Sequence, residues 1–331
     1  MISFRFHVVS ITAVFLAIAI GIVVGTTYVD TAVVDQLQNR IRTVSDNLDA
    51  RKEDNDRLEN DLGSARAYID SSALFAVTDR LTDVPVLLVA TRGIDEGAVE
   101  QVALLSRQAG ATVPGVVWLE AKWGLEGEDD RAALAEIVDA QPDEAVEDLW
   151  SSAWEAVVNE LTAQPATSPT GGSDPDGLTT TTTAPPDRVR EVLASLEAGG
   201  FLSVDSIDDA SSTLVDLAGV SPRVLVLTGA RAQAELVPMV RFVVSAPVQG
   251  GLLTVVADVH VEAPEALGRG EVLVEALDQE LRDAIGLVDD ADRPEGQVAV
   301  VLALDAVAAG VFGHYGYGDG ADGVLPRWTP P

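Results

Sequence analysis

The sequence predicts an α/β protein with a single N-terminal transmembrane helix, a coiled-coil stalk, and a Rossmann-like, mostly parallel domain with a disordered Thr-rich insertion. Three observations predict this architecture. An uncharged apolar run lies near the N-terminus, a heptad pattern follows it, and short apolar strands then alternate with helical patterns. Such alternation is typical of parallel sheets. We expect an anchor over 1–28, a coiled coil over 29–72, an α/β domain over 80–312 and a Gly- and aromatic-rich tail over 313–331.

The predicted membrane helix has no charged side chain between residues 8 and 25. These 18 residues span about 27 Å as a helix, close to the ~30 Å hydrocarbon core of a bilayer. A cleaved secretory signal, the alternative, has a shorter apolar run and a small-residue cleavage site. The sequence therefore favours an uncleaved anchor. Its members include Val8, Phe15, Leu16, Gly21 and Gly25.

The charges that flank this run predict its orientation. Arg5 and His7 precede it, whereas Asp30 and Asp35 follow it before the first cation, Arg40. By the positive-inside rule, the N-terminus is cytoplasmic and the rest of the chain is extracytoplasmic. The two glycines at the end of the run have GxxxG spacing. Such glycines either let two helices approach closely or simply face lipid.

A heptad pattern follows the membrane segment, with apolar residues at alternating spacings of three and four. Such a seam predicts a coiled coil, and a buried Asn in it can fix register and oligomer number. The alternative is that residues 51–57 form a solvated break between two short helices. The seam must pack against a partner, either a second copy or another membrane protein. The predicted interface residues are Val34, Leu37, Ile41, Val44, Leu48, Asn55, Leu58 and Leu62.

Composition excludes several classes of function. The formal net charge is −32, so the chain has the wrong sign for nucleic-acid binding. The chain has no cysteine, which excludes disulfides, Cys-based zinc sites, iron–sulfur clusters and thiol nucleophiles.

Strands and helices of the α/β domain are read from apolar runs and helical spacing. The predicted strands are 85–90, 112–119, 201–204, 224–227, 252–257 and 297–304. The predicted helices are 95–110, 128–140, 143–161, 187–198, 234–245 and 271–285, with a short helix reaching Ala309. Residues 164–186 are rich in Thr, Pro, Gly and Ser and predict a disordered insertion.

Ligands of open α/β sheets bind beyond the carboxyl ends of the strands. Polar residues at the predicted ends are Thr91, Arg92, Gly93, Glu120, residues 228–231, Asp258, His260 and Asp305. None of them forms a GxGxxG, P-loop or GxSxG motif, and the three histidines form no recognisable triad. We therefore expect no enzyme and no cofactor.

The C-terminal stretch Gly313–Gly320 combines alternating glycines with a histidine and two tyrosines. It predicts either a ligand loop around His314 and Tyr315 or a turn whose rings pack on the edge of the domain.

Three segments resemble a known family: residues 1–10 (MISFRFHVVS), residues 13–25 (AVFLAIAIGIVVG) and residues 313–318 (GHYGYG). They are similar to the actinobacterial copper transporter family of the mycobacterial copper transport protein B type. The resemblance implies copper efflux or a pore in the outer envelope. It makes His260 and His314 the candidate metal ligands and copper the only cofactor to consider. Similar corynebacterial proteins imply instead a role in cell separation, in which a membrane partner helps to control peptidoglycan cleavage.

The residues themselves fit direct copper conduction poorly. Copper sites prefer Cys or Met sulfur, or clustered imidazoles. The chain has no Cys, its two methionines are Met1 and Met239, and its histidines are far apart in sequence. One transmembrane helix also cannot enclose a channel alone. A copper-homeostasis membrane protein and a non-enzymatic coiled-coil scaffold are therefore the two hypotheses.

Overall fold

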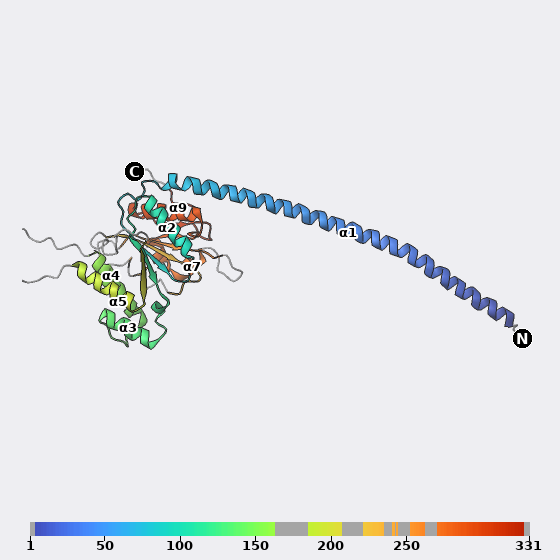
Figure 1. Cartoon of the computed structure of the whole chain (residues 1–331), viewed down its shortest axis with the longest axis horizontal. Helices are drawn as coiled ribbons and strands as arrows, with labels where there is room; N and C mark the ends of the chain where they lie inside the picture. Colours follow the sequence, from blue (N-terminus) through green and yellow to red (C-terminus); the bar gives the residue numbers. More distant parts are fainter. Residues whose placement is uncertain are drawn as a thin grey trace, which may run out of the picture. The chain divides into compact units, whose positions relative to one another are not determined.

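A computed structural model gives the structure of the chain (Figure 1). It describes residues 4–162, 185–206, 221–234, 240, 241, 243, 252–261 and 270–327. Two units make up the chain, Met1–Ala67 and Tyr68–Pro331.

Helix α1 runs without interruption from Phe4 to Val77. It contains one candidate membrane span, Phe4–Gly25, with a mean hydropathy of 2.7 and no buried residue. The helix continues through residues 51–57, so the predicted alternative of a break there is wrong. The sequence explains this continuity, since no Gly or Pro occurs between residues 26 and 62. Arg57 adds a local ion pair to Asp54 (3.0 Å).

The second unit contains a seven-stranded sheet in the order β3-β2-β1-β4-β5-β6-β7. Every neighbouring pair is parallel except β2 and β3, which are antiparallel. The predicted α/β class and mostly parallel sheet are therefore confirmed. The strands are β1 (Val86–Thr91), β2 (Gly115–Leu119), β3 (Leu202–Ser206), β4 (Arg223–Thr228), β5 (Thr254–Asp258), β6 (Gly286–Val288) and β7 (Gly313–Tyr315).

Helices cover both faces of the sheet (Figure 1). On one face lie α2 (Glu96–Gln108) and α9 (Pro294–Ala306), which pack on Val86, Leu88 and Ala90 of β1. The other face packs on Leu87 and Val89. Its helices are α3 (Glu128–Val138), α4 (Val146–Thr162), α5 (Pro185–Ala198), α7 (Glu271–Ala276) and α8 (Gln279–Ala284). Alternate residues of the central strands β1, β2, β4 and β5 thus belong to two separate cores, as the period of two requires.

Tryptophans anchor the core beneath α3, α4 and α5. Trp123, in the short 3₁₀ helix η1 (Ala121–Gly124), packs against Trp154 with ring centroids 5.2 Å apart. The Trp150 Nε1–H donates to the carbonyl of Trp123 (2.9 Å). Both helical tryptophans lie on α4 and are buried, so this core supplies intrinsic fluorescence probes of folding.

The prediction of a strand at 297–304 is wrong, because these residues lie within helix α9. Pro294 stands in its first turn, where the missing N–H costs nothing. Val298, Ala299, Val300 and Val301 are all buried and consecutive, so this part of the helix shows no exposed polar face. A short apolar run cannot be assigned to helix or strand by its pattern when both would be buried. A second 3₁₀ helix, η3 (Val307–Ala309), follows it.

Two other boundaries differ from the prediction. The helix expected over 271–285 is two helices, because Leu277 is extended and Asp278 caps α8 by accepting from the N–H of Leu281. The tail expected from residue 313 begins instead with β7, a strand of the same sheet. The Thr-rich segment lies outside the described residues up to 184, as does most of the helix predicted at 234–245.

Candidate functional site

The strand order reverses between β1 and β4, where open α/β sheets commonly bind ligands. In this protein, residues of the loops that follow the strands contact one another at this edge of the sheet. Arg92 Nη1 bonds to Glu96 (2.8 Å), its Nε bonds to Glu120 (3.1 Å), and its guanidinium stacks 4.3 Å from the ring centre of Trp118. A side chain at Gly93 would collide with the carbonyl of Arg231. The predicted strand-end residues therefore hold loops together at this point.

A cluster of carboxylates lies along β5, β6 and β7, the three strands beyond β4 in the strand order, at or near their carboxyl ends. Asp258 ends β5, while Asp289 and Asp290 follow β6, and all three are buried. His314, in β7, is also buried, and its Nε2 lies 3.2 Å from Asp289 Oδ2. Three neighbouring parallel strands thus bring acidic side chains and an imidazole together.

Asp289 holds the C-terminal loop in place. The N–H of Tyr317 donates to Asp289 Oδ1 (2.9 Å) and to Asp290 Oδ2 (2.9 Å), and the N–H of Gly318 donates to Asp289 Oδ2 (2.7 Å). Burial alone would raise the pKa of Asp289. Hydrogen bonds from His314, Asp290 and these two N–H groups outweigh burial and lower that pKa to about 2.

Asp322 closes the same loop from its other end. The N–H of His314 donates to Asp322 Oδ2 (3.0 Å), and the N–H of Asp322 donates to the carbonyl of His314 (2.7 Å). Gly316 has φ +135°, and a Cβ there would overlap the Asp289 carboxylate. Gly316 therefore allows the backbone to pass close to a buried carboxylate. The prediction of a turn whose rings pack on the domain holds for Tyr315, which is buried, but not for Tyr317, which is exposed.

Asp258 is the carboxylate of the cluster whose burial is offset by the fewest hydrogen bonds. The N–H of Gly270 donates to its Oδ2 (3.3 Å), whereas no described residue hydrogen-bonds to its Oδ1. Burial raises the pKa of Asp258 to about 7, and the negative charges of Asp292, Asp289 and Asp290 add to this rise. The folded protein therefore keeps a proton on this carboxyl group well above the pH at which an unfolded chain loses it.

Replacing Asp258 with Asn is expected to stabilise the second unit at pH 8. The unfolded chain loses this proton near pH 4 and the folded protein near pH 7. The folded state binds more protons in between, so the wild-type free energy of unfolding falls as pH rises from about 4 to about 7. Since each pKa unit is worth about 1.4 kcal/mol, the Asn variant should gain about 2 kcal/mol or more at pH 8. Urea unfolding at several pH values measures this.

The gain should shrink as pH falls from 7 and vanish below about pH 4, where the wild-type carboxyl group is protonated in both states. Asp319→Asn, which changes an exposed carboxylate of the C-terminal loop, is the matched control and should show no such trend. A pH-independent difference between Asp258→Asn and the wild type would contradict the assignment.

The structure places the two candidate metal ligands differently. His314 lies in the carboxylate cluster, whereas His260 follows β5 and is half-buried, with its backbone N–H 3.3 Å from Asp292 Oδ1. Among the described residues, no group of three or more His, Cys, Asp or Glu side chains is arranged to hold a metal ion. Copper binding at these histidines therefore stays a prediction.

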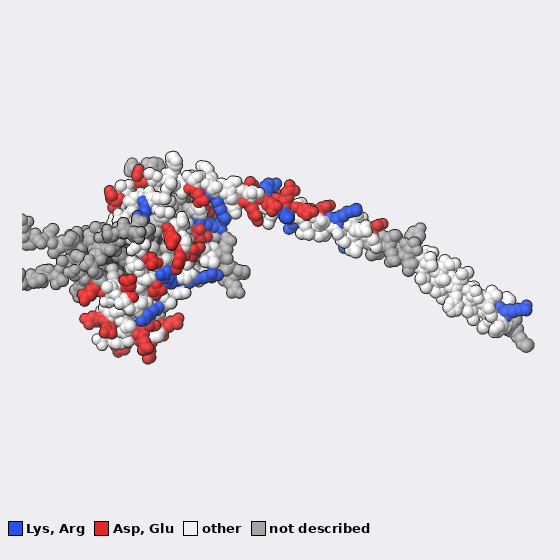
Figure 2. All heavy atoms as spheres, in the orientation of Figure 1, with Lys and Arg blue, Asp and Glu red and all other residues white. Residues whose placement is uncertain are grey.

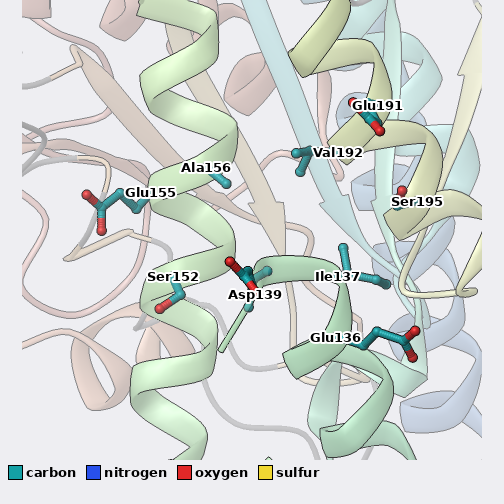
Figure 3. Close-up of a pocket in the computed structure, with 10 residues that line it drawn as sticks. Glu136, Ile137, Asp139, Ser152, Glu155, Ala156, Glu191, Val192 and Ser195 are labelled. Carbon is teal, nitrogen blue, oxygen red and sulfur yellow. The ribbon is translucent and has the colours of Figure 1, made fainter. Parts of the chain in front are cut away.

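A groove lies between α3, α4 and α5, with a volume of about 790 Å³ (Figure 3). Glu136 and Asp139 line it from the end of α3, Glu155 from α4 and Glu191 from α5, together with Ser152 and Ser195. Its apolar lining includes Ile137, Ala156 and Val192. Sequence reasoning did not find this groove, because its acidic residues are spread over three helices and form no motif.

The helix α1 carries the other predicted site residues. All the predicted seam residues are exposed, as are Val8, Phe15, Leu16, Gly21 and Gly25 of the apolar segment. In Figure 2 the charged side chains gather on the later part of α1 and on the second unit, and a long white stretch of α1 corresponds to the apolar segment.

The fold and its helix define a class of protein: an α/β domain with a mostly parallel sheet and one N-terminal helix long and apolar enough to cross a membrane. A family model described as "Copper transport outer membrane protein, MctB" matches residues 1–326. The chain belongs to this family, and the resemblance seen in the sequence is confirmed.

Curated relatives match over nearly the full chain. The copper transporter MctB of Mycobacterium tuberculosis (strain H37Rv) is 28% identical, covering 98% of this chain and 99% of the relative. The protein of the same name from Mycobacterium leprae is 26% identical over the same shares of both chains. The alignments therefore include the apolar helix, the rest of α1 and the α/β domain.

Proposed function

We propose that this chain is a single-span envelope protein of copper homeostasis, with its N-terminus in the cytoplasm and its α/β domain outside. The end-to-end family match carries the proposal, since relatives named as copper transporters align over 98% of the chain. The apolar helix Phe4–Gly25, which buries none of its residues, supports membrane anchoring, because such a surface is stable in lipid and costly in water.

We propose a non-enzymatic role for the α/β domain. Where the strand order reverses, the loops after β1 and β4 close on each other, with the N–H of Gln233 donating to the carbonyl of Arg92 (2.9 Å). The buried carboxylates after β6 are engaged with the C-terminal loop. One apolar helix cannot surround an aqueous path by itself, so efflux would require an assembly of several chains. A contribution to copper efflux is therefore proposed for an assembly, and His260 is its candidate copper contact in the α/β domain.

Copper tolerance tests the functional proposal. A strain that lacks the gene should become copper-sensitive, and the full-length chain should restore tolerance. A variant with Leu16→Arg and Ile18→Arg should fail to restore it, because charges at the centre of the span cost about 2.5–3.5 kcal/mol each on insertion. A variant with Asn39→Arg and Asn60→Arg, two exposed positions of α1 that lie outside both the apolar segment and the predicted seam, controls for the two added charges. Full tolerance in the strain that lacks the gene would overturn the copper role.

The orientation has its own test, because the chain contains no cysteine. A single cysteine at Asp319, an exposed position of the C-terminal loop, should react in intact cells with a maleimide that cannot cross membranes. A single cysteine at Ser3, ahead of the apolar segment, should react only after the cells are opened. Reversed labelling would contradict the proposed orientation.

A second candidate is a scaffold of cell separation that acts with a membrane partner on peptidoglycan cleavage. The exposed apolar stripe of α1 favours an interaction role of this kind. Cell chaining without copper sensitivity in the strain that lacks the gene would support this candidate over the first.

A further inference from the structure

We propose that α1 pairs with the α1 of a second copy of this chain, as a parallel, in-register, two-stranded coiled coil over residues 34–66. The proposal deepens the proposed function by naming its partner, and it rests on the proposed membrane anchoring for the parallel direction. Its first support is exposure. The seven apolar seam residues are 47% to 61% exposed, although they recur with the spacing of a packed helix face. These residues are Val34, Leu37, Ile41, Val44, Leu48, Leu58 and Leu62.

The residue types at the seam favour two strands. Taking Val34 as heptad position a, the a positions begin with the β-branched pair Val34 and Ile41, and Leu37 and Leu58 occupy d positions. β-branched residues at a with Leu at d favour parallel dimers over larger bundles. Asn55 falls at an a position. Two facing Asn side chains hydrogen-bond to each other only when the two helices are in register, so this layer specifies a self-pair.

Flanking charges also fit a second copy. In the same heptad frame, Asp61 is a g position and Arg66 is the e position five residues later. In a parallel in-register dimer, this pair forms an ion pair twice, once on each side. Asp54 would approach Glu59 of the other copy, but its carboxylate is already bound to Arg57 of its own helix (3.0 Å). The ion pair with Arg57 offsets part of the repulsion between Asp54 and Glu59 of the other copy.

Arg51 distinguishes a second copy from a different partner. It occupies a d position and is exposed, so a second copy places another arginine opposite it. Like charges at facing seam positions weaken pairing. Arg51→Leu should therefore tighten a dimer of this chain. A different partner that offers an acidic residue opposite Arg51 would instead bind the Leu variant more weakly.

Site-specific cross-linking of the full-length chain in lipid nanodiscs tests the proposal, since the natural chain has no cysteine. Leu37→Cys and Leu58→Cys place thiols on the seam, and Asn39→Cys and Asn60→Cys place them on the outer f positions two residues away. With a short bis-maleimide, each seam variant should yield at least about fivefold more cross-linked dimer than its outer control. Arg51→Leu added to Leu58→Cys should raise this yield further.

Several outcomes would overturn the proposal. Equal yields at seam and outer positions would show that this face does not pair with itself. Cross-linking only between a Leu37→Cys chain and a Leu58→Cys chain would indicate an antiparallel pair. A lower yield with Arg51→Leu would indicate a different, acidic partner. None of these results bears on copper tolerance or on maleimide labelling, so failure of the pairing is distinguishable from failure of the proposed function.

Discussion

Replacing Asp289 with Ala is expected to lower the free energy of unfolding of the second unit by about 3–5 kcal/mol, the range for removing one partner of a buried charged network. The variant leaves the N–H of Gly318 without its acceptor and His314 without the carboxylate 3.2 Å away. Urea denaturation, followed by the fluorescence of Trp123, Trp150 and Trp154, measures the change, because all three rings are buried in the second unit.

Asp319→Ala is the matched control, since it removes an exposed carboxylate from the same loop. It should change stability by no more than about 0.5 kcal/mol. The pH dependence supplies a second check. The pKa of Asp289 is about 2 in the fold, below its unfolded value near 4, so its contribution is complete above about pH 4 and is lost as pH falls towards 2. If Asp289→Ala matched the wild type at pH 7, the assigned role of this carboxylate would be wrong.

Gly316→Ala is expected to destabilise the second unit by about 3 kcal/mol or more. Its φ of +135° is strained for any residue with a Cβ, which costs about 1–3 kcal/mol. The new methyl group would also overlap the Asp289 carboxylate, and relieving that overlap would pull the N–H groups of Tyr317 and Gly318 away from their acceptors. Thermal unfolding monitored by near-ultraviolet circular dichroism measures the loss.

Gly320→Ala separates the two causes of this effect. Gly320 also has a positive φ, +89°, but a Cβ there meets nothing within 4 Å. Its substitution should cost only the backbone strain, about 1 kcal/mol. Equal losses for the two variants would show that the contact with Asp289 contributes nothing.

Local patterns predicted most of the fold because the central strands are buried on both faces. β1, β2, β4 and β5 are apolar runs bounded by turn residues, and all were found. The same signal misassigned α9, a helix that begins with a run of buried apolar residues at 298–301. β6 and β7 have three residues each, which is too short for any periodicity to be recognised.

Only half of the candidate site could be predicted, because it is positioned partly by these short strands. Asp258 and His314 were identified, one by its place after an apolar strand and the other by the glycines around it. Asp289 and Asp290 were missed, because no strand was predicted at Gly286–Val288, between the helix expected over 271–285 and the strand expected over 297–304. The available signal was a pair of aspartates directly after Gly286–Val288 and shortly before Pro294, a residue that often begins a helix.

The position of β7 near the end of the sequence has a consequence for biosynthesis. Asp289 leaves the ribosome before residues 313–318, which supply β7 and the N–H donors of its carboxylate. Until those residues arrive, the unfinished chain must keep this edge of the sheet open to water, since burying an unpaired carboxylate is costly. Translation products that stop before Gly313 should therefore remain incompletely folded and be removed by proteases, so that only full-length chains accumulate.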